Sequence, residues 1–153
     1  MRAGENVRFL LEAGGEDYKA HARWGELQTA YTGSRVVPGW TIDVRRVSDP
    51  NPLPGYRALF ALADGLLTSQ MMEVLREGYG RRGLPEATIA AVAGLVGMPI
   101  HSSTNAQALR IMDNEARYGG GERVWQRLTE RGRARYDETL HRFVYVPSPG
   151  VDP

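Results

Sequence analysis

The proline-rich stretch at residues 48–55 divides this chain of 153 residues into two parts of different character. Its sequence, SDPNPLPG, places three prolines within five positions. Proline has no backbone N–H and disfavours the helical conformation of the residue before it, so we expect no regular element to cross this stretch. The chain is therefore expected to consist of an N-terminal arm at 1–54, a domain at 55–145 and a flexible tail at 146–153.

The N-terminal arm has mixed patterning. Residues 6–12 carry apolar side chains at helical spacing and end at two glycines, which predicts a short helix. Residues 40–47 alternate between apolar and polar side chains, which predicts a strand. Residues 25–32 fit neither pattern. We interpret the arm as an irregular α+β segment that supplies an oligomerisation or partner surface.

The first half of the second part has the composition of helices. Residues 56–79 are rich in Leu, Ala, Met and Glu, and we expect two helices that separate near Gly65. Residues 85–96 repeat apolar side chains at helical spacing. Pro85 suits the first turn of that helix, and Gly97 suits its end.

The rest of the chain predicts a helix, a hairpin and a final helix. Residues 102–116 begin with three good N-capping residues and predict a helix. Residues 117–128 contain three consecutive glycines between short segments with β-branched or aromatic residues, which favours a hairpin. The last helix is expected at 130–143, after an N-cap at Thr129.

This order of elements, between residues 69 and 143, is typical of a winged helix-turn-helix. Four strings, at 67–76, 92–97, 103–113 and 127–134, resemble those of MarR-type winged-helix regulators. The resemblance covers residues 56–143 and leaves the first third unmatched. It implies a fold that is mainly α with a small β wing, namely a winged helix-turn-helix preceded by an irregular α+β segment.

A winged helix of this family would read double-stranded DNA with the helix at 103–114. The side chains expected to face the duplex share hydrogen-bonding chemistry suited to bases or phosphates. They are Ser103, Thr104, Gln107, Arg110 and Asn114 on the helix, His101 at its entrance, and Arg117 and Arg123 beside the wing. The leading hypothesis is a sequence-specific transcriptional regulator that acts as a homodimer.

The alternative hypothesis is a winged helix that binds protein, such as a phage-type host-directed or assembly protein, without DNA readout. A net charge of +1 does not require a nucleic-acid partner. Small-molecule effectors are common in the resembled family, but the sequence identifies none for this chain.

Composition argues against several other classes. The chain has no cysteine, and its three histidines are not at metal-ligand spacing, so we expect no metal, no cofactor and no enzymatic activity. Of its 19 basic residues only Lys19 is a lysine. No apolar run is long enough to span a membrane, and residues 1–12 lack the apolar core of a secretion signal, so we expect a cytoplasmic protein.

Overall fold

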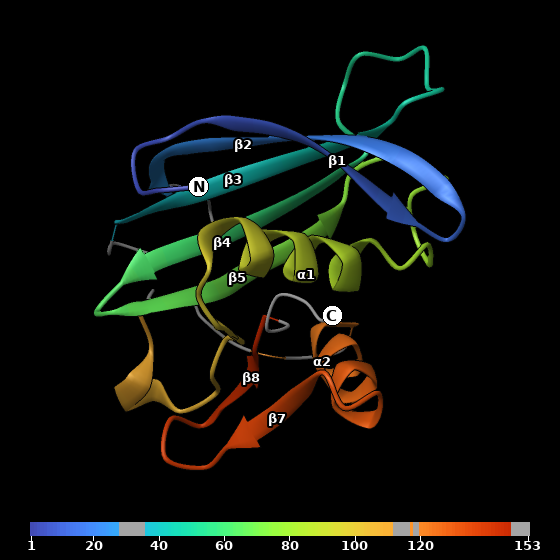
Figure 1. Ribbon diagram of the computed structural model, residues 1–153. Helices are drawn as coiled ribbons and strands as arrows, with labels where there is room; N and C mark the ends of the chain where they lie inside the picture. The colour runs from blue at the N-terminus through green and yellow to red at the C-terminus, as the bar shows by residue number, and fades with distance from the viewer. Residues whose placement is uncertain (28–35, 112–116, 118–119, 148–153) are drawn as a thin grey trace, which may run out of the picture.

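One curled sheet dominates the computed structural model, which describes residues 1–27, 36–111, 117 and 120–147 (Figure 1). In these residues eight strands lie in the order β1-β2-β3-β4-β5-β6-β8-β7. They are β1 (Val7–Ala13), β2 (Glu16–Leu27), β3 (Val37–Arg46), β4 (Tyr56–Ala63), β5 (Leu66–Val74), β6 (Ile100–His101), β7 (Ala134–Asp137) and β8 (Arg142–Tyr145). The described part also has two α-helices, α1 (Leu84–Val96) and α2 (Gly120–Glu130), and a 3-10 turn, η1 (Gln107–Leu109). The expected mainly-α class is therefore wrong, because the protein is mainly β.

The N-terminal arm forms strands instead of an irregular segment. The helix expected at 6–12 is strand β1, whose inward side chains Val7, Phe9 and Leu11 alternate with outward ones. Gly14 and Gly15 both have positive φ, at 58° and 79°, and join β1 to β2 in a two-residue turn. Such a turn needs positive φ at both positions, and its twist matches that of the strands it joins. The strand expected at 40–47 is confirmed over residues 40–46, within β3.

The helices expected at 56–79 are the antiparallel strands β4 and β5. Asp64 and Gly65, with φ of 55° and 77°, form the two-residue turn between them. β4 is buried on both faces over most of its length, so its Leu- and Ala-rich sequence lacks the alternation that marks a half-exposed strand. The sheet also continues across the proline-rich stretch, because β3 pairs with β4.

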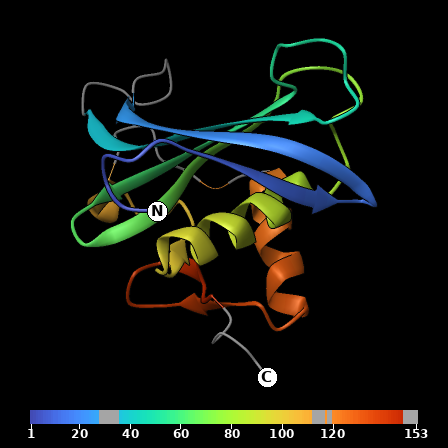
Figure 2. The same cartoon turned by 45° about the horizontal axis from the view of Figure 1, so that its top comes forward.

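Helix α1 confirms the helix expected at 85–96. Pro85 lies in its first turn, and Gly97 ends it in the left-handed conformation with its N–H donating to the carbonyl of Ala93. The helix lies against the inner face of the curled sheet, where it contacts β1, β4 and β8 (Figure 2). We call the opposite face of the sheet the outer face.

In the C-terminal part of the chain, a helix lies where a hairpin was expected and a hairpin lies where a helix was expected. Gly120 and Gly121 begin helix α2 where a hairpin was expected, and the helix buries Val124, Trp125 and Leu128. The helix expected at 130–143 is instead the hairpin of β7 and β8, with a tight turn at His141 (φ 52°). Tyr136 and Phe143, seven residues apart and so on one face of the expected helix, lie opposite each other on the paired strands and meet edge to face with ring centroids 5.0 Å apart.

The resemblance to winged-helix regulators does not hold. A winged helix needs a scaffold helix, a reading helix and a wing, but residues 103–111 contain only the short η1 turn. The main core lies between the sheet and the two α-helices. A smaller core on the outer face gathers under Ile111 and consists of Leu27, Val37, Leu59, Ala61 and Ile111.

Candidate functional site

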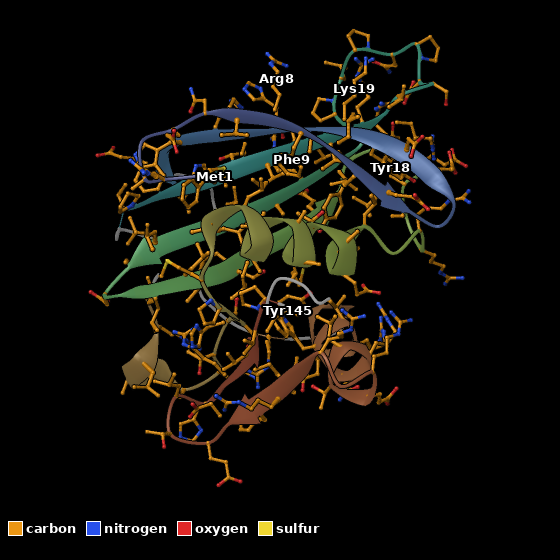
Figure 3. The ribbon with its side chains drawn as sticks, viewed as in Figure 1. Met1, Arg8, Phe9, Tyr18, Lys19 and Tyr145 are labelled. Atoms are coloured by element: carbon orange, nitrogen blue, oxygen red, sulfur yellow. The ribbon has the colours of Figure 1, made fainter. Side chains whose placement is uncertain are left out.

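A groove of about 460 Å³ lies on the outer face of β1, β2 and β3. The loop at residues 48–55 forms one wall of it. Figure 3 shows Arg8 and Lys19 on the side of the sheet away from α1, whereas Phe9 lies between the sheet and the helix. The side chains of the groove are mostly cationic or apolar. They come from Arg8, Leu10, Lys19, His21, Asp43, Arg45, Pro52 and Pro54.

Strand alternation explains why these side chains share one face. Residues two apart on a strand point to the same side, and antiparallel pairing aligns them with residues on neighbouring strands. One row across the sheet contains Arg8, His21 and Asp43. The next row contains Leu10, Lys19 and Arg45. Three strands therefore bring basic residues that are far apart in the sequence into two adjacent rows.

Asp43 is the one carboxylate among the groove-lining residues of the described structure, and two arginines outside that lining neutralise it. Its Oδ2 lies 2.5 Å from the guanidinium of Arg23, and its Oδ1 lies 2.6 Å from Nε of Arg57. Within the described residues Arg8, Lys19 and Arg45 form no ion pair with a carboxylate. The groove thus presents a local positive charge although the whole chain is nearly neutral.

His21 is the titratable residue at the centre of the first row. Partial burial lowers the pKa of its imidazole, and the charges of Arg8 and Arg23 lower it further, while Asp43 acts in the opposite direction. The imidazole is therefore neutral at pH 7. It becomes cationic only in acid, which would make the groove more positive there.

Hydrogen bonds hold the loop that forms the groove wall. Nη1 of Arg45 donates to the carbonyls of Asp49 and Asn51 at 3.0 and 3.4 Å. Oδ1 of Asp49 accepts from the N–H of Asn51 at 2.9 Å, and Oδ1 of Asn51 accepts from the N–H of Leu53 at 2.9 Å. These Asx turns stiffen the segment. Residues 48–55, which were expected to separate two parts of the chain, thus form an ordered wall of the groove.

Tyr79 anchors the same loop from the other side. Its hydroxyl donates to Asp49 and accepts from the backbone N–H of Arg46. The guanidiniums of Arg46 and Arg76 lie 4.3 and 5.1 Å from the centre of its ring. The hydroxyl of Tyr79, the N–H of Asn51 and the guanidinium of Arg76 together hold the pKa of Asp49 far below its usual range. Asp49 is therefore ionised at neutral pH and holds the loop at residues 48–55 in place.

The residues expected to face DNA do not form one exposed surface. Ser103 and Thr104 are buried, and the hydroxyl of Ser103 donates to the carbonyl of Ser69 at 2.7 Å. Gln107 lies in η1, and Arg110 is half-buried. Asn114 lies outside the described residues.

The other three residues expected to face DNA, His101, Arg117 and Arg123, lie in different surroundings. His101 lies in β6, where burial, and next the charge of Arg142, lower the pKa of its imidazole. Arg117 is nearly buried and already engaged, because it pairs with Glu122 at 2.7 Å and donates to the carbonyl of Ser103 at 2.7 Å. Arg123 is exposed on α2. A role of these residues in DNA binding stays a prediction, without the helix that motivated it.

Sequence reasoning missed both the groove and a second arginine near Arg117. Arg142 is 1% exposed and donates to the carbonyls of Ser102 and Leu109 at 2.7 and 2.8 Å. Arg142 therefore links residues 102–109 to strand β8. For the groove, a signal was present in the alternation of Arg8, Leu10 and Glu12 before a two-glycine turn.

No protein-family model matches the chain, and no curated protein or solved structure matches it. Among the described residues no group of three or more His, Cys, Asp or Glu side chains could hold a metal ion. No helix in the described ranges has the length and apolarity needed to cross a membrane.

Proposed function

We propose that this protein is a binding domain whose outer-face groove takes an acidic, extended segment of a partner protein. The observation that carries the proposal is the charge of the groove. Its cations have no carboxylate partner in the described structure, whereas its one acidic side chain, Asp43, is neutralised by Arg23 and Arg57. A carboxylate entering the groove would therefore meet the cations without having to break an existing ion pair.

The apolar lining supports a peptide over a small inorganic anion. Leu10 is 73% exposed at the rim, and Pro52 and Pro54 face it from the wall. An apolar side chain between two acidic ones would cover these residues. About four extended residues suffice to cross three strands that lie about 4.8 Å apart.

A protein partner is favoured over nucleic acid. Sheet surfaces that bind single strands stack bases on exposed aromatic rings, and these rings supply much of the affinity. Among the described residues that line the groove none presents an outward aromatic ring, because Phe9 belongs to the inner side of β1. This function agrees with the alternative hypothesis of a protein-binding module, but the module is a curled sheet and not a winged helix.

We propose that the protein binds its partner without catalysing a reaction. The part of the groove lining that the structure describes contains no Ser, Thr or Cys that could act as a nucleophile. Its histidine stands between arginines and a carboxylate that is already paired. A cytoplasmic location is kept as part of the proposal.

The test is fluorescence anisotropy with a labelled peptide that contains the sequence Glu-Glu-Leu-Glu between Gly-Ser flanks. Lys19→Gln removes one groove charge and should raise the dissociation constant about threefold, and Lys19→Glu about tenfold, as expected for exposed ion pairs. The matched control is Arg131→Gln, which removes an exposed cation outside the groove. Affinity should fall with salt, since screening acts within about 10 Å at 0.1 M.

Two results would reject the proposal. Equal affinity of wild-type protein and Lys19→Glu would place the peptide elsewhere. Tighter binding of a single-stranded oligo-dT than of the acidic peptide, with the same sensitivity to Lys19, would make the groove a nucleic-acid site. A Gln-Gln-Leu-Gln peptide, which has no carboxylates, should bind more weakly than the acidic peptide.

A further inference from the structure

Strand β1 leaves one side of its backbone unpaired. It is the first strand of the sheet and pairs only with β2. Within the described residues none of its backbone groups bonds to anything beyond β2. An open strand edge is a ready template for another strand, and proteins usually protect it. Here Leu10 lies at the middle of the edge with 73% of its surface exposed.

The free backbone groups of β1 belong to Arg8, Leu10 and Glu12. The carbonyl of Asp17 accepts from the N–H of Val47, so it faces β3 and not β1. In antiparallel pairs, hydrogen-bonded and non-bonded positions alternate. Glu12, which lies opposite Asp17, therefore directs its own N–H and C=O away from β2.

The same alternation applies to Leu10 and Arg8, which lie two and four residues before Glu12. The turn at residues 14–15 gives the same phase, because the residues flanking a two-residue turn form a hydrogen-bonded pair. Three residues of β1 thus present donors and acceptors in the direction where a further strand would lie.

The side chains along this edge are complementary to themselves. Arg8, Leu10 and Glu12 all point to the outer face, and neither Arg8 nor Glu12 forms an ion pair within the described residues. We propose that β1 pairs antiparallel with β1 of a second copy of this chain, about a two-fold axis at Leu10. Arg8 of each copy then lies opposite Glu12 of the other, and the two Leu10 side chains meet.

Only this register satisfies both the charges and the backbone. Centring the axis on Arg8 or Glu12 would place like charges opposite each other, which destabilises cross-strand pairs. Centring it on Phe9 or Leu11 would oppose residues whose backbone groups are already directed to β2. At Leu10 the free donors and acceptors of both copies match, as they must in an isologous interface.

Helix α1 supports the same arrangement. It packs beside β1 (Figures 1 and 2). Its residues Ala90 and Gly94 are exposed, small and uncharged. A two-fold axis perpendicular to the sheet places the α1 helices of both copies on the same side. Small side chains would let these helices approach each other closely. Arg8 and Leu10 also line the groove, so in the dimer Lys19, His21 and Arg45 remain for the acidic segment while Arg8 pairs with Glu12 of the second copy.

Mass measurement by light scattering during gel filtration tests the dimer through charge exchange. The wild-type protein should dimerise within concentrations up to about 200 μM. Arg8→Glu and Glu12→Arg each create two like-charge pairs and should raise the dissociation constant about tenfold or more. An equimolar mixture of the two variants should recover the dimer, because every pair is then opposite in charge. The double variant should recover it as well.

The control and the crosslink use the same chain. Arg131→Glu, on an exposed residue outside the interface, should dimerise like the wild type. Since the chain has no cysteine, Leu10→Cys supplies a single thiol, and opposed residues about 5.5 Å apart can form a disulfide. Val74→Cys, exposed on β5, should stay uncrosslinked. A monomeric wild type, or a variant mixture that stays monomeric while circular dichroism shows folded chains, would overturn the proposal.

Discussion

The substitution Gly39→Ala tests how closely β3 and β4 approach each other. A Cβ at Gly39 would lie 2.0 Å from the carbonyl oxygen of Phe60 and 2.9 Å from Cα of Ala61. Both atoms belong to the backbone of β4, so no side-chain rotation can remove the clash. An ordinary carbon–oxygen contact is about 3.3 Å, so the strands must separate by about 1.3 Å at this point.

The size of the effect follows from that separation. Backbone hydrogen bonds of about 2.9 Å on both sides of Gly39 would lengthen beyond bonding distance. Losing two of them costs about 2 kcal/mol, and the strain of an overpacked site adds about 1 to 3 kcal/mol. We therefore expect a loss of about 3 kcal/mol or more, a large share of the stability of a domain of this size.

Urea unfolding followed by tryptophan fluorescence measures this loss. With an m-value of about 2 kcal/mol/M, the unfolding midpoint should fall by about 1.5 M. The control is Gly25→Ala, because Gly25 lies opposite Gly39 in β2 and a Cβ there meets nothing within 4 Å. The control should change stability by no more than about 0.5 kcal/mol. Equal midpoints for Gly39→Ala and wild-type protein would refute the close approach of β3 and β4.

Two further predictions concern the buried polar groups near β8. Arg142→Met removes the donor to the carbonyls of Ser102 and Leu109 and should cost about 3 kcal/mol in urea unfolding. Arg135→Met, on an exposed side chain, should cost less than about 0.5 kcal/mol, and similar losses for the two variants would contradict this account. Because burial lowers the pKa of His101, the unfolded chain takes up the proton first, so the unfolding free energy should fall as pH drops below about 6.5. Midpoints at pH 7.5 and 5.5 should differ less for His101→Asn than for wild-type protein, and an equal difference would count against the buried imidazole.

The parts of the fold that sequence reasoning predicted are those with local signals. Helix α1 carries its own start and stop in Pro85 and Gly97, and its apolar spacing needs no partner to be recognised. Within β3, residues 40–46 alternate because the outer face of that strand is partly exposed. Local chemistry was sufficient in both places.

Strand β4 was mistaken for a helix because burial removes the pattern that distinguishes a strand. A strand covered on both faces is apolar throughout, and a Leu- and Ala-rich sequence then has the propensity of a helix. The turn at Asp64 and Gly65 was a usable hairpin signal. The spacing in 130–143 also fits a helix, yet its side chains meet by pairing between β7 and β8.

The groove could not be read from spacing in the sequence. Lys19 and Arg45 become neighbours only through the register of β2 and β3, which the intervening chain does not specify. The burial of Arg142 was equally hidden, because an arginine is expected at the surface unless its partners are known. Both depend on contacts between distant residues.

By itself the sequence determined the local features of this protein: one helix between a proline and a glycine, one alternating strand and a chain without thiol chemistry. The tertiary structure alone decided which apolar segments became strands, which arginines were buried and which cations came to share a face. The physical reason is that backbone propensities differ by less than about 1 kcal/mol per residue, so the pairing of strands and the burial of their faces determine the outcome.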